Sequence, residues 1–246
     1  MPNPSLFFTE SKGSGVPLIL IHGAGGVHLH WPPQLRRWAG GRVVALDLPG
    51  HGQSGGPQCG SIAEFAQATV KLLDELQISR AVVAGHSMGS GIAQTLALDY
   101  PDRVAGLVLV GAGARLRVAP QIMDGIQKDF PGAVSLIIQW AFGPNAPEPL
   151  TRLARERMLQ TPPQVLLADY AACNAFDVME RVANIAAPAL VLAGTADKMT
   201  PEKYGRYLAE HIPGAQLRLF EGAGHMVMLE QPDEVTAAIT AFVATL

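Results

Sequence analysis

Hydrophobic residues in this chain fall into short, largely apolar runs that alternate with longer segments of mixed polarity. The runs lie at 17–22, 42–47, 81–84, 104–110, 188–194 and 216–220. Runs of this kind are typical of strands that are covered on both faces in a parallel sheet. A shorter apolar segment at 6–9 predicts an additional edge strand.

The segments between these runs have helical spacing. Over 62–76, apolar residues recur every three or four positions, as on one face of an α-helix. Helices are also predicted at 31–39, 90–99, 201–211 and 232–244. Strands that alternate with helices imply right-handed crossovers between parallel strands. The pattern therefore predicts an α/β fold, with a doubly wound, mostly parallel sheet and helices on both of its faces.

This alternation stops over 111–175, where no convincing strand is found. Proline-punctuated helical runs lie there at 120–129, 134–142, 149–159 and 163–175. Because strand and helix patterns alternate again from 188 onward, the helical block is predicted to be an insertion. We expect a core formed by 1–113 and 176–246, and a helical cap at 114–175 over the carboxyl ends of the strands.

The motif Gly-His-Ser-Met-Gly at 85–89 lies between an apolar run and a helical segment. A serine flanked in this way is typical of a nucleophile elbow, a sharp turn that exposes its central side chain. Gly85 and Gly89 have no Cβ that would collide across such a turn. The hypothesis assigns Ser87 as nucleophile and directs the backbone N–H of Met88 toward an oxyanion. A plain glycine-rich turn is the structural alternative.

An acid and a histidine follow Ser87 in the order that this motif requires. Asp197 follows the run at 188–194, and His225 follows the run at 216–220. Loops beyond the carboxyl ends of parallel strands are where chemistry collects in open α/β sheets. The chain order serine, acid, histidine favours a catalytic triad.

Each of the two later residues also has an ordinary structural interpretation. Asp197 could cap the helix predicted at 201–211, because a short acid before Thr-Pro is a common N-cap. His225 could be a histidine of a surface loop. A different acid would be expected after the run at 104–110, but 111–114 contains none.

The chemistry explains why these residue types are needed. A serine hydroxyl is a poor nucleophile at neutral pH and needs a neighbouring base, which imidazole supplies. Asp197 would hold the tautomer of His225 and stabilise its imidazolium. The glycine-rich loop at 23–26 would supply a second oxyanion donor, the backbone N–H of Ala24.

Length and composition agree with one compact, rather apolar domain. The chain has 246 residues, of which 48% are hydrophobic and 16% are charged. Its formal net charge of −3 argues against nucleic acid or an anionic membrane as partner. No signal peptide and no membrane-spanning run is apparent, so we expect a cytoplasmic protein with two reduced cysteines, Cys59 and Cys173. The oligomeric state stays open.

Neither a metal nor a cofactor is expected. His22, His28 and His30 are close in sequence, but their loop has no accompanying carboxylate or cysteine. The glycines at 23–26 do not form a dinucleotide fingerprint. The only predicted ligand is a small-molecule substrate.

Large apolar side chains in the cap are candidate substrate contacts. They are Met123, Trp140, Phe142 and Met158. Each one alone is expected more often in the cap core than against a substrate, but together they predict an apolar ceiling over Ser87.

These motifs together carry a family resemblance: His-Gly-Ala-Gly at 22–25, Asp-Leu-Pro-Gly-His-Gly-Gln-Ser at 47–54, 85–89, Gly-Thr-Ala-Asp at 194–197 and Gly-His at 224–225. The chain resembles the α/β-hydrolase fold superfamily, of the cap-bearing kind that includes bacterial esterases, lactonases and carbon–carbon bond hydrolases. The resemblance makes 47–54 a structural turn, so Asp47 and His51 are not expected to be catalytic. Haloalkane dehalogenases and epoxide hydrolases resemble this fold but have an aspartate where Ser87 lies.

The leading hypothesis is a cofactor-free serine hydrolase that cleaves a small, largely apolar ester, thioester or lactone through an acyl-enzyme. One alternative is a carbon–carbon bond hydrolase of a diketone with the same triad. Another, from a different class, is a ligand receptor that retains the fold. A proline iminopeptidase is disfavoured, because the cap has no clear cluster of acids that would hold a substrate amine. Four scattered acids keep this alternative open. Those acids are Glu148, Glu156, Asp169 and Asp177.

Overall fold

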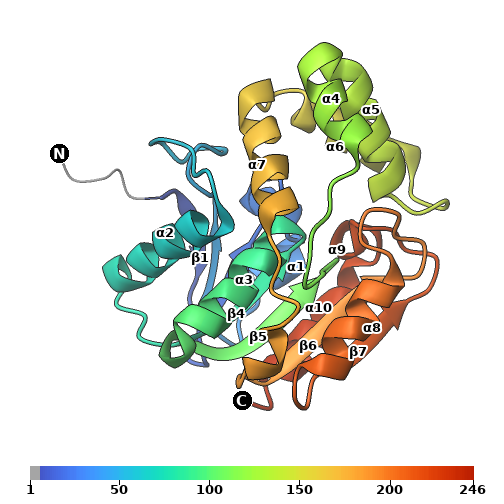
Figure 1. The fold of residues 1–246 in the computed structure, drawn as a ribbon. Coiled ribbons are helices and arrows are strands. Elements are labelled where there is room, and N and C mark those ends of the chain that lie inside the picture. The colour runs from blue at the N-terminus through green and yellow to red at the C-terminus, as the bar shows by residue number, and fades with distance from the viewer. Residues whose placement is uncertain (1–5) are drawn as a thin grey trace.

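A computed structural model describes residues 6–246 of the chain as a three-layer α/β structure (Figure 1). Seven strands form one sheet in the order β1-β3-β2-β4-β5-β6-β7. They are β1 (Phe8–Ser11), β2 (Leu18–Ile21), β3 (Val43–Leu46), β4 (Ala81–His86), β5 (Val104–Val110), β6 (Ala189–Gly194) and β7 (Gln216–Phe220). All pairs are parallel except β1 with β3, which confirms the predicted mostly parallel sheet.

Helices cover both faces of the sheet, as predicted. On one face lie α2 (Ile62–Glu75), α3 (Met88–Asp99) and α8 (Glu202–His211), and on the other lie α1 (Pro33–Arg36) and α10 (Pro232–Val243). Successive side chains of a strand point to opposite faces. Ile19 and Ile21 of β2 therefore join the apolar cluster under the first group, whereas Leu18 and Leu20 join the cluster under the second.

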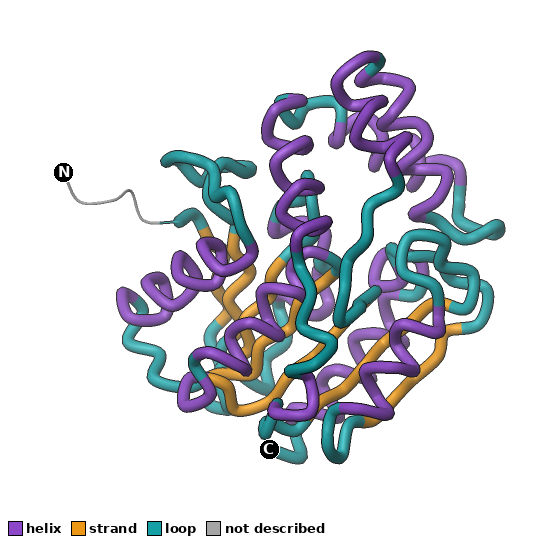
Figure 2. Tube along the Cα trace, viewed as in Figure 1, coloured by secondary structure: helices purple, strands orange, loops and turns teal. Residues whose placement is uncertain are grey.

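Between β5 and β6 the chain forms four consecutive α-helices that gather above one end of the sheet (Figures 1 and 2). They are α4 (Pro120–Lys128), α5 (Phe130–Ala141), α6 (Glu148–Met158) and α7 (Pro163–Ala175). Each has proline in its first turn, where the missing N–H has no helical acceptor to lose.

The chain enters and leaves this helical block along adjacent paths. The N–H of Val178 donates to the carbonyl of Ala114 at 2.8 Å, and Arg115 lies opposite Asp177 in an antiparallel bridge. The two connections therefore hold each other in place next to the carboxyl end of β5.

Two predicted elements differ from the structure. The edge strand expected at 6–9 is β1, which starts at Phe8, where pairing with Leu46 begins. The helix expected at 31–39 is only the single turn α1, preceded by a 3-10 turn at His28–His30. Pro32 and Pro33 delay the start of this helix, and the chain leaves it at Arg37. A further short helix, α9 (Val227–Glu230), had no clear signal in the sequence.

Within residues 6–246, none of the helices combines the length and the apolarity that crossing a bilayer requires.

Candidate active site

Ser87 lies where β4 ends and α3 begins. Its φ of 52° and ψ of −116° are strained for a residue with a side chain. The flanking glycines make this corner possible: a Cβ on Gly85 would collide with the carbonyl of Gly89, and one on Gly89 would collide with the carbonyl of Ile21. The N–H of Ser87 donates to the carbonyl of Val110 at 2.9 Å, which ties the corner to β5.

Asp197 and His225 form a buried pair at the carboxyl ends of β6 and β7. The Nδ1 atom of His225 lies 2.8 Å from Oδ2 of Asp197. The Asp197 carboxylate also accepts the N–H of Met199 (2.7 Å), the N–H of Thr200 (2.9 Å) and the hydroxyl of Thr200 (2.8 Å). These bonds fix the orientation of the acid toward the imidazole. Asp197 is not the N-cap of α8, because Pro201 occupies that position.

The loop after β2 brings further backbone donors to Ser87. A Cβ added to Gly23 would lie 3.0 Å from Cβ of Ser87, so the loop passes directly beside the serine. Within residues 6–246, the backbone N–H groups of Ala24 and Met88 donate to no protein acceptor. The Met88 N–H is at the N-terminus of α3, the positive end of the helix dipole. Both sequence-predicted oxyanion donors are therefore free to bind a ligand.

Two cavities meet at Ser87 and His225. The smaller, of about 40 Å³, is lined by Gly23, Ala24 and apolar side chains of the cap, and Phe142 and Met158 are among them. The larger, of about 300 Å³, contains Trp140 in its wall.

Of the four cap residues predicted to contact substrate, Phe142 and Met158 line the smaller cavity and Trp140 lines the larger one. Met123 lines neither cavity and packs, half-buried, against the apolar cluster that the cap shares with the second face of the sheet. The helix that carries it places Ile122 at the larger cavity instead. The expectation that Met123 contacts substrate is not supported by its position, because successive residues of a helix point in different directions.

The histidines of the glycine-rich loop are engaged by neighbouring groups. His22 Nδ1 lies 2.8 Å from the carbonyl of Gly23, and its Nε2 accepts the N–H of Leu48 at 3.0 Å. Burial lowers the pKa of His22 well below its ordinary value, so the ring is neutral. His28 Nδ1 lies 2.8 Å from Asp47. Among the described residues, no group of three or more histidines, cysteines or acids has a metal-binding arrangement.

Asp47 and His51 have structural roles in the turn at 47–54. The Asp47 carboxylate accepts the backbone N–H groups of His28 (2.7 Å) and Gln53 (2.9 Å). Both residues are buried and neither lines the two cavities at Ser87.

Asp169, which the sequence analysis named only among the acids of the cap, is a buried acid next to the site. It lies on α7, and its Oδ2 accepts the N–H of Gly25 at 2.8 Å and lies 2.7 Å from Nε2 of His51. The hydroxyl of Thr161 donates to the carbonyl of Gly25 at 3.3 Å. The cap thus holds both polar groups of Gly25, the residue after Ala24.

Thr200 and His86 also contact the acid–histidine pair. Besides its bond to Asp197, the Thr200 hydroxyl lies 3.1 Å from Nδ1 of His225. The Nε2 atom of His86 lies 3.0 Å from the carbonyl of His225, and the two rings are 4.7 Å apart. Burial, followed by the nearby His225, lowers the pKa of His86 well below its ordinary value. The Asp-x-x-Thr spacing was the one sequence signal for Thr200.

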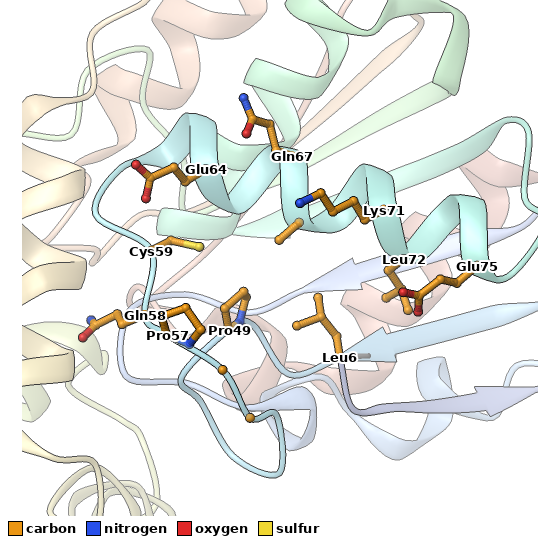
Figure 3. Close-up of a pocket in the computed structure, with 13 residues that line it drawn as sticks. Leu6, Pro49, Pro57, Gln58, Cys59, Glu64, Gln67, Lys71, Leu72 and Glu75 are labelled. Atoms are coloured by element: carbon orange, nitrogen blue, oxygen red, sulfur yellow. The ribbon is translucent and has the colours of Figure 1, made fainter. Parts of the chain in front are cut away.

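A separate cavity of about 230 Å³ lies between α2 and the loop at 55–59 (Figure 3). Cys59 points into it from that loop, and Lys71 and Glu75 line it from α2. Burial raises the pKa of Cys59 to about 11, so its thiol is protonated at neutral pH. Neither Ser87 nor His225 reaches this cavity.

Comparison with known proteins identifies the family. The alpha/beta hydrolase family matches the chain over residues 18–238. A solved structure of a thermophilic esterase is 37% identical with a TM-score of 0.85, and the match covers 95% of this chain and 92% of that one. Est816, an N-acyl homoserine lactone degrading enzyme, is 30% identical with a TM-score of 0.89, and 96% of each chain is covered.

A curated relative from Pseudomonas putida, the dihydrolipoyllysine-residue acetyltransferase component of the acetoin cleaving system, is 32% identical over 96% of this chain. The chain spans 65% of that relative's length and 64% of the length of the same component from Cupriavidus necator. The chain belongs to the alpha/beta hydrolase family, and the esterase and lactonase among its structural neighbours support an enzyme of the hydrolase class.

Proposed function

We propose that this protein is a serine hydrolase that cleaves small carboxylic esters, thioesters or lactones through an acyl-enzyme on Ser87. The observation that carries the proposal is the strained Ser87 corner with a buried His225–Asp197 pair and two free backbone donors beside it. Strain of this kind persists where the surrounding structure holds a residue for function. The esterase and lactonase among the relatives support the same class of reaction.

The first half-reaction forms the acyl-enzyme. Ser87 Oγ attacks the carbonyl carbon of the substrate while Nε2 of His225 accepts the hydroxyl proton. Asp197 holds Nδ1 of His225 protonated and stabilises the imidazolium. The N–H groups of Ala24 and Met88 stabilise the oxyanion, and each such donor contributes about 2.7–4 kcal/mol to the transition state.

The second half-reaction releases the acid. His225 gives its proton to the leaving alcohol or thiol, and a water molecule then enters in its place. His225 removes a proton from that water, which attacks the acyl carbon and frees Ser87. None of these steps requires a metal ion, so EDTA is expected to leave the rate unchanged.

The smaller cavity limits the acyl group. Gly23 and Ala24 line it, so an acyl chain whose carbonyl oxygen reaches Ala24 N–H extends among the apolar side chains of the cap. Each buried methylene contributes about 0.8 kcal/mol, or roughly fourfold in kcat/KM. The rate is therefore expected to rise over the shortest acyl chains and to fall once the cavity of about 40 Å³ is filled.

The direct test is hydrolysis of 4-nitrophenyl esters from acetate to octanoate by the wild type and by Ser87→Ala. The wild type is expected to turn over many times, and Ser87→Ala is expected to lose turnover without losing stability. Ser135→Ala is the matched control, because Ser135 is an exposed serine of the cap. Turnover that survives in Ser87→Ala would exclude Ser87 as nucleophile, and a single turnover by the wild type would favour the receptor alternative.

A further inference from the structure

The larger cavity at Ser87 has a basic wall. Arg117 and Lys198 line it together with Ser87 and His225, and none of its lining residues is an aspartate or a glutamate. Arg117 lies on the connection into the cap, and Lys198 lies on the loop after β6, directly after the acid of the pair. The two cations thus approach the cavity from two different segments of the chain.

Neither cation is neutralised by a partner in the part of the chain that the structure describes. No carboxylate lies within ion-pair distance of Arg117 or Lys198. Asp177, on the connection out of the cap, pairs with Arg115 at 2.6 Å. The pKa of Asp177 is lowered first by the Met179 N–H, then by Arg115 and to a smaller extent by Arg117.

Hydrogen bonds fix the backbone on both sides of each cation. Before Lys198, the N–H of Asp197 donates to the carbonyl of Gly194 at 3.3 Å, and after it, the N–H of Met199 donates to the Asp197 carboxylate at 2.7 Å. On the other segment, the N–H of Val118 donates to Asn174 at 3.2 Å, and the N–H of Leu116 donates to the carbonyl of Phe176 at 3.3 Å. The charges are therefore held near the cavity by anchored loops, although the side chains themselves are exposed.

The positive charge of this wall is opposite in sign to the formal net charge of the whole chain, which is −3. The smaller cavity has no such character: it contains no lysine, arginine or acid, and its His86 is neutral because burial lowers its pKa. An anionic group is thus favoured in one half of the site and is excluded from the other by the cost of desolvation.

We propose that the substrate carries a carboxylate or a similar anionic group on its leaving-group side, held in the larger cavity by Arg117 and Lys198. This inference rests on the proposed hydrolase function. The acyl side is assigned to the smaller cavity because the oxyanion loop lines it, which leaves the larger cavity for the alcohol or thiol. For two solvent-exposed cations, we expect a preference of about three- to tenfold in kcat/KM.

The test compares 4-acetoxybenzoate with 4-acetoxybenzamide, which have nearly the same shape and differ by one charge. The enzymes are the wild type and the double variant Arg117→Gln/Lys198→Gln. The double variant Lys12→Gln/Lys71→Gln is the control, because it removes two exposed cations that do not line the larger cavity. Ratios of kcat/KM between variants cancel the different intrinsic reactivity of the two esters.

Replacing Arg117 and Lys198 is expected to lower kcat/KM for the benzoate ester about three- to tenfold more than kcat/KM for the benzamide ester. The control variant Lys12→Gln/Lys71→Gln is expected to keep the wild-type kcat/KM for both esters. About 0.5 M salt should reduce the preference of the wild type for the benzoate ester over the benzamide ester. An equal effect of Arg117→Gln/Lys198→Gln on both esters, or no effect on either, would overturn the inference.

Two further arms separate the possible failures. If the benzamide ester is turned over through Ser87 but the charge preference is absent, the inference fails and the hydrolase function stands. If Ser87→Ala hydrolyses both esters, the proposed function fails. In a second pair of esters, 4-nitrophenyl hemisuccinate has a carboxylate on its acyl group and 4-nitrophenyl butyrate has none. If the wild type prefers the hemisuccinate and Arg117→Gln/Lys198→Gln abolishes that preference, the assignment of the two cavities is overturned.

Discussion

Two of the buried histidine–carboxylate pairs in this molecule have nearly the same contact distance and very different surroundings. His225 lies 2.8 Å from Asp197, and His51 lies 2.7 Å from Asp169. His225 lines both cavities beside Ser87. His51 lines neither of them, and its second ring nitrogen lies 3.0 Å from the carbonyl of Pro49.

The difference lies in the ring nitrogen that does not face the acid. In the described residues, Nε2 of His225 makes no hydrogen bond, so it can exchange a proton with a substrate or with Ser87. In His51 both ring nitrogens face acceptors, which favours the doubly protonated ring. Burial lowers the pKa of His51, but the hydrogen bond and the charge of Asp169 outweigh burial and raise it.

The contrast shows that a short histidine–acid distance does not by itself define a catalytic pair. The pair at Ser87 leaves one ring nitrogen free at a cavity. The pair of His51 and Asp169 uses every ring nitrogen and joins the cap to the loop that carries Ala24 through Gly25. The first arrangement suits proton transfer, and the second suits positioning.

Replacing the two histidines in the same way is expected to give the largest difference. His225→Gln should lower kcat on the order of 10⁶-fold, because loss of the base from a serine triad costs about as much as loss of the whole triad. His51→Gln should retain kcat within about tenfold, because His51 does not reach the cavities. Steady-state kinetics with 4-nitrophenyl acetate measures both. Comparable losses in the two variants would contradict the division of roles.

Isosteric replacement of the two acids should separate chemistry from stability. Asp197→Asn should fold normally and lose activity on the order of 10⁴-fold, because the amide favours the wrong tautomer of His225. Asp169→Asn should keep most of its activity but lose about 3 kcal/mol of stability, because a fully buried pair loses its charge. For a chain of this size that lowers Tm by about 6–12 °C.

The control for the second acid is Asp177→Asn, which breaks the exposed pair with Arg115 and should cost less than about 1 kcal/mol. Calorimetry and kinetics on the same preparations check both quantities. If Asp169→Asn is as inactive as Asp197→Asn at full stability, Asp169 takes part in the chemistry itself.

The smallest expected effect is the pH dependence of the His51–Asp169 pair. The folded state raises the pKa of His51, so the pair contributes its full stabilisation below the unfolded-state pKa of about 6.5. That contribution is lost as the pH rises through the folded-state pKa, at about 1.4 kcal/mol per unit of difference. Urea unfolding of the wild type and of His51→Gln should show an advantage for the wild type that shrinks with rising pH. A constant or growing advantage would contradict the raised pKa.

The sheet and the elbow could be predicted because local pattern determines them. Apolar runs identify buried strands, and parallel strands bring their carboxyl ends to one edge, so Ser87, Asp197 and His225 were expected on neighbouring loops. In the structure they lie on these loops. Ser87 and His225 line the same two cavities, and Asp197 contacts His225. The helix expected at 31–39 is only one turn long, because Pro32 and Pro33 delay its start, and apolar spacing alone does not report that effect.

The role of Asp169 could not be predicted because it depends on tertiary contacts. Asp169 is 144 positions from Gly25 and 118 from His51 in the chain, and only the placement of α7 over the sheet brings them together. The same holds for the cap residues: spacing alone does not separate Trp140, at the larger cavity, from Met123, inside the cap.

The most direct test of the central claim is covalent labelling with a fluorophosphonate, followed by intact mass and peptide mapping. The Ser87 mechanism predicts one adduct per chain, on Ser87, in the wild type and in Asp169→Asn, and no adduct in Ser87→Ala. Labelling of His225→Gln should be greatly slowed, because the base that activates Ser87 is lost. An adduct on another residue, or full labelling of Ser87→Ala, would contradict the assignment of Ser87 as the nucleophile.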